Sequence, residues 1–352
     1  MLDSEPKIDI EYVKSLTREL LAIPSIAGDC DEATQRIARE FEKYDIPVAE
    51  TKKRAIVGTW RGRDDERHRL VAAHVDTLGA TVRQIKPNGR LRLYPIGGFD
   101  WRAFEGENCT VRTLFGREHR GTLMPDHASR HAQTESTRDE AHDMEKMEVR
   151  LDVETSSRES TEALGIYCGD PVFFEPRMEV TAEGYVKSRF LDDKLGIAIL
   201  FGAMKAMKER ALPLAHTSHF YISNYEEIGH GTPVIPPKTV EFASIDIGVV
   251  AEGHTSDERA VTILARDGVT PYDRKTIRRL ARLAQTNEIP FRVDTYLNYG
   301  SDASCSVKAG NDVRAVCFGP GVEATHHYER THLDSVMASA RLLTAWLADE
   351  IT

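Results

Sequence analysis

The chain has 352 residues, of which 41% are hydrophobic and 29% are charged, a composition typical of a soluble globular protein with one large domain or two ordinary ones. Its formal net charge of -10 disfavours binding to nucleic acid or to anionic membranes, because the sequence lacks the basic stripes that such partners require. It also lacks an apolar run long enough to cross a bilayer and an apolar signal-peptide core at the N-terminus, so we expect a cytoplasmic protein.

Two helices and two strands are predicted before residue 80. Apolar residues at helical spacing predict amphipathic helices over residues 8–22 and 31–43. Short apolar runs at residues 55–60 and 70–73, separated by a polar segment, predict two strands joined by a turn. The second strand leads directly into His74-Val75-Asp76, so we expect two polar side chains at the point where this strand ends.

Residues 81–183 have a different sequence pattern. Short alternating runs lie there between turn signals such as Pro87-Asn88-Gly89 and Gly97-Gly98, and this pattern predicts an inserted all-β domain. We expect the segments on either side, residues 1–80 and 184–352, to form one discontinuous domain around the insertion.

After the insertion the helical period returns. The helix predicted from residue 191 is apolar nearly all round, which indicates a buried helix. Strands and helices then alternate to the C-terminus, with strands over residues 219–223, 242–250, 260–265, 292–297 and 314–318, and helices over residues 275–286 and at the C-terminal end. This alternation predicts an α/β fold with a mostly parallel central sheet flanked by helices. Functional sites in such sheets lie at strand ends.

Glu226 and Glu227 are adjacent carboxylates that follow an apolar run predicted to be a buried strand. A carboxylate that is taken out of water must be compensated by a cation or by several hydrogen bonds, so this strand end indicates a nearby positive charge. The alternative is a strand end that simply reaches solvent. Other predicted strand and helix ends also carry side chains that can bind metal, namely His74, Asp76, Asp192, Asp193, Asp246 and His326.

Each of these other pieces has an ordinary structural interpretation. His74 could be a strand-end histidine with a local hydrogen bond. As a metal ligand it would instead share one side of an ideal strand with Asp76, or Asp76 would orient its ring by accepting its second N–H. The Asp192-Asp193 pair could serve only to cap a helix and to complement its dipole. Asp246 could be a turn residue that ends a strand.

Taken together in chain order, these pieces resemble the signature of the M42 family of metallo-aminopeptidases, within the wider clan of co-catalytic dizinc exopeptidases. The pieces are His74-x-Asp76, Asp192-Asp193-x-x-Gly196, Glu226-Glu227-x-Gly229, Asp246 and His326. The resemblance spans essentially the whole chain and includes the position of the β insertion. The segment Tyr299-Gly300-Ser301-Asp302-Ala303 is also similar to the family's Gly-Thr-Asp-Ala turn.

The resemblance implies a zinc-exopeptidase-like fold with a β-barrel-like insertion that serves oligomerisation. It further implies a homo-oligomer, with a dodecamer as the specific expectation, and two divalent metal ions per subunit. Zinc is the expected metal, with cobalt or manganese as alternatives, because nitrogen and oxygen ligands suit these ions.

The resemblance also implies a role for each site residue. Asp192 bridges the two ions. His74 and Asp246 complete one metal site, and Glu227 and His326 complete the other. Two further residues have catalytic roles: Glu226 as the general base and Asp76 as the residue that orients His74.

Two departures from the family pattern leave alternatives open. The family's usual Arg-Tyr-x-His-Ser segment is replaced here by a run that contains both His326 and His332, so His332 is an alternative to His326 as the last ligand. The phrases PIGGFDWR and EGENC resemble a bacterial branch associated with osmoprotectant dipeptide metabolism.

The resemblance thus predicts an aminopeptidase that acts on short peptides. A dimetal deacylase, acting on an N-acylated amino acid or dipeptide derivative, would use the same ligands and is the first alternative. A non-catalytic relative that acts as a binding protein is the second alternative.

Overall fold

The computed structural model describes residues 7–137 and 141–351. Residues 1–6, which begin the N-terminal segment discussed above, lie outside the described residues. The chain divides into two compact units, of which the first comprises Met1–Asp76 and Arg177–Thr352 and the second comprises Thr77–Pro176.

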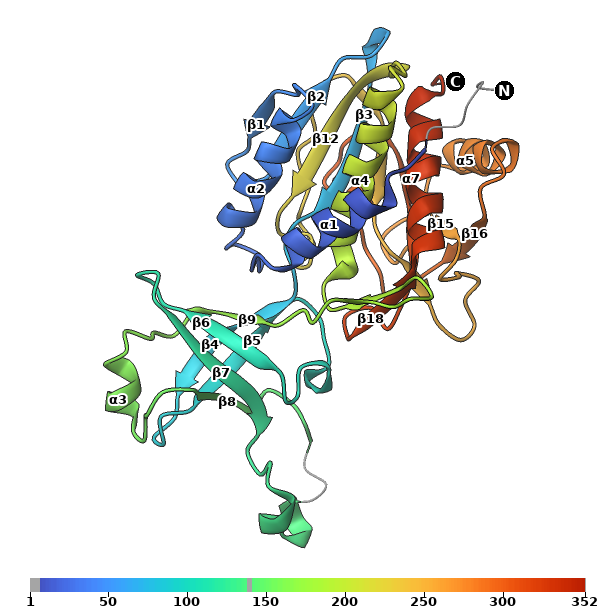
Figure 1. Cartoon of the computed structure of the whole chain (residues 1–352). Helices are drawn as coiled ribbons and strands as arrows, with labels where there is room; N and C mark the ends of the chain where they lie inside the picture. Colours follow the sequence, from blue (N-terminus) through green and yellow to red (C-terminus); the bar gives the residue numbers. More distant parts are fainter. Residues whose placement is uncertain (1–6, 138–140, 352) are drawn as a thin grey trace. The chain divides into compact units, whose positions relative to one another are not determined.

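A twisted sheet forms the centre of the first unit (Figure 1). Its path runs in the order β1-β2-β12-β3-β13-β17, and β12, β3, β13 and β17 are mutually parallel. The strands are β1 (Val48–Glu50), β2 (Ile56–Trp60), β3 (Asp64–His74), β12 (His216–Ser223), β13 (Thr239–Ile245) and β17 (Arg314–Glu323). Because parallel strands point the same way, their carboxyl ends meet at one edge of the sheet.

Shorter strands extend this sheet beyond β17. The strand β15 (Val261–Arg266) pairs antiparallel with β17 and parallel with β16 (Phe291–Thr295), and β14 (Gly248–Val250) pairs parallel with β17. The strand β18 (Glu329–His332) joins β17 to β11 (Tyr185–Ser188), which pairs with β10 (Glu179–Val180). The strand β10 lies within residues 81–183, the predicted insertion, yet β10 and β11 belong to the sheet of the first unit, because the second unit ends at Pro176.

Helices cover the sheet, and α4 is the most buried of them. Figure 1 shows α4 between α1 and α7, and nearly every residue of α4 is buried, as its apolar sequence predicts. The helices of this unit are α1 (Ile10–Leu21), α2 (Asp31–Glu42), α4 (Leu191–Glu209), α5 (Arg274–Thr286), α6 (Asp302–Lys308) and α7 (Leu333–Ala348). No helix among the described residues combines the length and the apolarity that crossing a membrane requires.

The second unit is a closed antiparallel barrel with the strand order β4-β5-β8-β7-β6-β9. Its strands are β4 (Gly79–Ile85), β5 (Leu91–Ile96), β6 (Asn108–Arg112), β7 (Glu118–Pro125), β8 (Met147–Leu151) and β9 (Pro171–Phe174). A short helix, α3 (Arg158–Glu162), and three single turns, Trp101–Ala103, Arg130–Ala132 and Glu135–Thr137, lie in its loops. Alternate residues such as Val82, Leu93 and Leu123 fill the barrel interior. The predicted fold class, α/β with a mostly parallel sheet and a barrel-like insertion, is confirmed.

The strand β3 is longer than its apolar run predicts. It begins at Asp64, inside the stretch that the sequence assigns to a turn, and Asp64 pairs with His216 of β12. The residues from Asp65 to Arg67 are exposed, because this part of the strand reaches solvent at the end of the sheet. The apolar pattern therefore predicts only the buried half of the strand.

Candidate metal centre

The candidate site lies where the parallel strands end. The strand β3 ends at His74, β12 ends four residues before Glu227, and β13 ends one residue before Asp246. The other two predicted ligands come from different elements, Asp192 from the first turn of α4 and His326 from the loop between β17 and β18. The topology therefore brings together residues that are distant in sequence.

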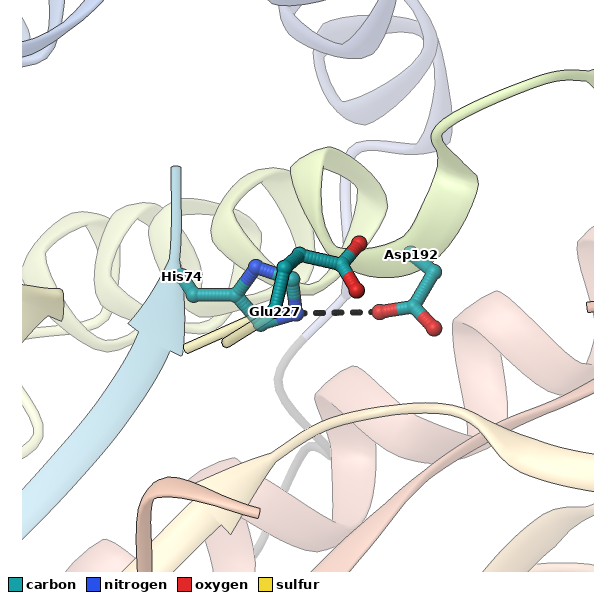
Figure 2. A group of neighbouring side chains, drawn as sticks. All are labelled: His74, Asp192 and Glu227. Carbon is teal, nitrogen blue, oxygen red and sulfur yellow. Dashed lines mark hydrogen bonds and ion pairs between the residues drawn. The ribbon is translucent and has the colours of Figure 1, made fainter. Parts of the chain in front are cut away.

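His74, Asp192 and Glu227 form one close group, shown in Figure 2. One ligand atom from each lies within 4.8 Å of the others, and His74 Nε2 is 3.0 Å from Asp192 Oδ1. The Oε1 atom of Glu227 is buried and has no hydrogen-bond partner among residues 7–137 and 141–351. A buried carboxylate oxygen without a partner is costly, so this donor set fits a divalent cation.

His326 faces the second carboxylate oxygen of Asp192, whereas His74 faces the first. Its Nε2 atom is 3.5 Å from Asp192 Oδ2 and 3.5 Å from Glu227 Oε2. The two oxygens of Asp192 thus face two different imidazoles. Asp246 is buried and lines the same cavity as Asp192, Glu227 and His326, and its Oδ1 accepts the N–H of Ile247 at 2.7 Å.

Glu226 and Asp76 lie beside this group. The Oε2 atom of Glu226 is 3.7 Å from His74 Nε2. The Nδ1 atom of His74 lies 2.9 Å from the main-chain oxygen of Asp76, which can only accept, so Nδ1 donates and Nε2 is the atom directed at Asp192. The Asp76 carboxylate instead accepts the main-chain N–H groups of Glu226 at 3.1 Å and Glu227 at 3.2 Å. Asp76 therefore orients His74 through its main chain and the two glutamates through its side chain.

Three further buried acids lie beside the group, and only the first of them, Asp193, is a metal-capable candidate in the sequence. Asp193 accepts the N–H of His74 at 3.1 Å, and Asp302 accepts the hydroxyl hydrogen of Ser223. Glu329 accepts two main-chain N–H groups, as described below. The sequence could have suggested Asp302, which lies in the family-like turn, but no local pattern distinguishes Glu329.

The alternative ligand His332 is engaged elsewhere. Its Nε2 donates to the main-chain oxygen of Glu183 at 2.8 Å, and its Nδ1 accepts the N–H of Asp334 at 3.0 Å, which caps α7. His327 is exposed, and its Nδ1 accepts the N–H of Tyr328 at 2.8 Å. The hydrogen bonds of His327 and His332 therefore direct neither ring toward Asp192.

The backbone next to the ligands is unusual. Four residues other than glycine have positive φ there: Phe190 (64°), Tyr225 (74°), Ala324 (56°) and His326 (60°). Such conformations are costly for residues that carry a Cβ atom, and they concentrate at functional sites. The surrounding contacts therefore stabilise positive φ values that these residues disfavour on their own.

Burial and mutual repulsion raise the pKa values of most carboxyl groups here. Burial is the main cause for Glu227, whose pKa rises to about 8, for Asp246, whose pKa rises to about 7, and for Asp302, whose pKa rises to about 6. Asp192 differs, since hydrogen bonds to His326 and His74 outweigh its burial and lower its pKa. The site therefore has more buried acid than its two imidazoles can compensate, and a divalent cation would offset the difference.

A cavity of about 590 Å³ opens onto these residues. A volume of this size is typical of small-molecule and peptide sites. Its lining includes the acids Asp192, Glu226, Glu227 and Asp246, together with His326, Tyr299, Cys305 and Lys308.

The sequence matches the model of the M42 glutamyl aminopeptidase family over residues 55–342. It is 40% identical over 335 residues to the candidate aminopeptidase YhfE of Bacillus subtilis (strain 168), a match that covers 95% of this chain and 96% of YhfE. A TET aminopeptidase from a marine sediment archaeon of the Thaumarchaeota has a similar fold, with a TM-score of 0.86 and 18% identity over 96% of both chains. The TET1 peptidase of Pyrococcus horikoshii gives a TM-score of 0.83 and 22% identity over 96% of this chain and 100% of that one.

The raised pKa values predict how the stability of the metal-free protein depends on pH. A carboxyl group with a raised pKa holds its proton more tightly in the folded state, so its stabilising contribution is present at low pH and is lost as pH rises through its folded pKa. For Asp302, Asp246 and Glu227 the loss begins near their ordinary pKa values of 3.8, 3.8 and 4.5 and is complete only above their folded pKa values of about 6, about 7 and about 8. We expect the melting temperature after chelation to fall across this pH range, and added Zn²⁺ to raise it most at the alkaline end.

Differential scanning fluorimetry with and without Zn²⁺ measures this effect. The variant Asp246→Asn removes one of the titrating groups, so its melting temperature should depend less steeply on pH. A metal-free protein whose melting temperature stays level across the range, or a metal effect that does not grow with pH, would contradict the electrostatic interpretation.

Proposed function

Because this chain belongs to the M42 family of aminopeptidases, we propose that it hydrolyses the first peptide bond of short peptides in a metal-dependent reaction. The observation that carries this proposal is the buried group of His74, Asp192 and Glu227 beside a cavity that Glu226 also lines. A dense set of acids with too few compensating cations is what a divalent metal site requires.

We propose that two divalent ions, zinc in the first instance and cobalt or manganese as alternatives, are held by five residues. Asp192 is shared between the ions, a role supported by its two oxygens, which face His74 at 3.0 Å and His326 at 3.5 Å. The proposed ligands are His74, Asp192 and Asp246 for one ion and Asp192, Glu227 and His326 for the other. Ions held there would polarise the peptide carbonyl and lower the pKa of the attacking water.

Glu226 is the proposed general base. Its carboxylate takes a proton from the attacking water and passes it to the leaving amine, so that the side chain returns to its initial state after each cycle. Burial raises the pKa of Glu226 above the usual value for a glutamate, which suits a group that must both take and release a proton near neutral pH. Asp76 supports this role, since its carboxylate holds the main chain of Glu226 and Glu227.

The natural substrate could also be an N-acylated amino acid or dipeptide derivative, as in the osmoprotectant-related alternative. The same ligands serve both reactions, and the difference lies in the recognition of a free amino terminus. Matched peptides with free and N-acetylated termini, assayed after reconstitution with each metal, distinguish the two. Hydrolysis of the acetylated series alone would replace the aminopeptidase proposal.

We propose that the barrel of residues 77–176 mediates self-association in the cytoplasm. Two structures with this fold support the idea: PhTET1-12s, with a dodecamer in the asymmetric unit, and the TET1 peptidase of Pyrococcus horikoshii, which can assemble into a tetrahedron or a large octahedral shell. The specific proposal is a dodecamer.

Glu226→Gln preserves the shape of the side chain and removes its basic oxygen. We expect this variant to bind metal as the parent does and to lose about two to four orders of magnitude in kcat, the range expected for loss of a positioned base. Glu227→Gln is the matched control, because the same change in the adjacent proposed ligand should weaken metal binding and be partly rescued by excess metal.

Metal-to-protein ratios and steady-state kinetics of the two variants measure these effects. A Glu226→Gln enzyme that keeps both metals and full turnover would exclude Glu226 as the base. Two variants with the same loss of metal would show that the neighbouring acids share one role.

The identity of the last ligand is tested by three single substitutions. His326→Ala should lose one metal ion per chain and nearly all activity, because it removes the imidazole that faces Asp192 and Glu227. His327→Ala should retain both ions. His332→Ala should lower thermal stability through loss of its contact with Asp334, yet retain both ions. Loss of metal in His332→Ala, with the metal content of His326→Ala unchanged, would show that the last ligand is His332 and not His326.

The proposed assembly predicts a particle of about twelve chains. Light scattering should therefore give a mass near twelve times 39.5 kDa. Deletion of the barrel should lower this mass while the remaining chain keeps its metal group. A parent protein with the mass of one chain, or a deletion variant with the parent's mass, would exclude the barrel as the assembly domain.

A further inference from the structure

Glu329 makes two hydrogen bonds that join separate parts of the site. It is the first residue of β18, and its side chain is buried, with 1% of the residue exposed. Its Oε2 accepts the main-chain N–H of Asp192 at 3.2 Å, and its Oε1 accepts that of His326 at 3.2 Å. The Asp192 bond connects residues that are 137 positions apart in the chain.

We infer that Glu329 is a positioning residue that fixes the main chain of Asp192 relative to that of His326, so that their side chains face the same cation. This inference rests on the proposed metal ligands. Glu329 itself is directed at two N–H groups and is not proposed as a ligand.

The two segments that Glu329 holds depend on such support. Asp192 lies in the first turn of α4 but has φ -74° and ψ 101°, which is not helical, and the first N–H groups of a helix have no partner within the helix. His326 has φ 60° and follows Ala324 with φ 56° in the loop between β17 and β18. A buried acceptor therefore compensates N–H groups that regular secondary structure does not satisfy.

The position of the Glu329 carboxylate is itself fixed by the sheet. Glu329 pairs with Ser188 of β11, and the next residue, Arg330, pairs with Glu323 at the end of β17. A glutamate on a paired strand has less freedom than one on a loop, which makes it a suitable reference point for both ligands. Partners of metal ligands typically change metal affinity about 10-fold to 100-fold when they are removed.

The two bonds use different oxygens of the Glu329 carboxylate. Glutamine has one acceptor oxygen and one NH₂ group, so in the same position its NH₂ group would face one of the two N–H groups, donor against donor. Aspartate keeps both oxygens and the charge but is shorter by one methylene group. The two substitutions therefore separate the effect of the charge of Glu329 from the effect of the length of its side chain.

The test is titration of the metal-free parent and variants with Co²⁺ alone, followed by the visible absorption bands of the bound ion. We expect Glu329→Gln and Glu329→Asp each to weaken binding of one Co²⁺ ion about 10-fold to 100-fold and to change its spectrum, because the ligand geometry is altered. The matched control is Glu323→Gln, the same substitution at an exposed residue just before the same loop, which should retain the parent affinity and spectrum.

Thermal unfolding of the metal-free proteins separates positioning from general loss of structure. Weaker binding and a changed spectrum in protein that is fully folded at the titration temperature support the inference. Parent-like affinity and spectrum in Glu329→Gln would overturn it, and so would full restoration by Glu329→Asp, since charge alone would then suffice. A parent that binds no Co²⁺ would instead refute the proposed metal site itself.

Discussion

The main physical constraint on this structure is the burial of many carboxylates around two imidazoles. Asp76, Asp192, Asp193, Asp246 and Glu329 are all buried at one edge of the central sheet, and Glu226 and Glu227 lie beside them. In the protein interior this arrangement is unfavourable unless protons or cations offset the charge, which is why the pKa values of most of these groups are raised. The fold tolerates the cost because hydrogen bonds from main-chain N–H groups support several of the acids.

The architecture explains how one chain concentrates these groups. Parallel strands β3, β12 and β13 end at the same edge and deliver His74, Glu227 and Asp246, while the buried helix α4 brings Asp192 to that edge. The strand β18 then holds Glu329 under the loop that carries His326. The ends of the strands and of α4 thus bring these side chains together, and long-range hydrogen bonds orient several of them. The barrel is a separate compact unit and contributes none of these residues.

Much of this could be predicted from the sequence because it follows from local patterns. Apolar periods indicated the buried helix α4 and the alternating strands, and polar residues at strand ends indicated the site. The role of Glu329 could not be predicted, because its partners lie far away in the chain and its own segment has no distinctive period. The sequence predicts a turn for the polar half of β3 for a related reason, since pairing with β12, and not apolar character, defines that part of the strand. The roles of the individual ligands follow from the family resemblance and not from local pattern.

Anomalous scattering from crystals of the zinc-loaded protein, collected on both sides of the zinc absorption edge, locates the bound ions directly. We expect two anomalous peaks beside Asp192, one bounded by His74 and Asp246 and the other by Glu227 and His326. Peaks elsewhere in the molecule, or a fully occupied zinc site that leaves Asp192 without a metal, would contradict the proposed dimetal centre.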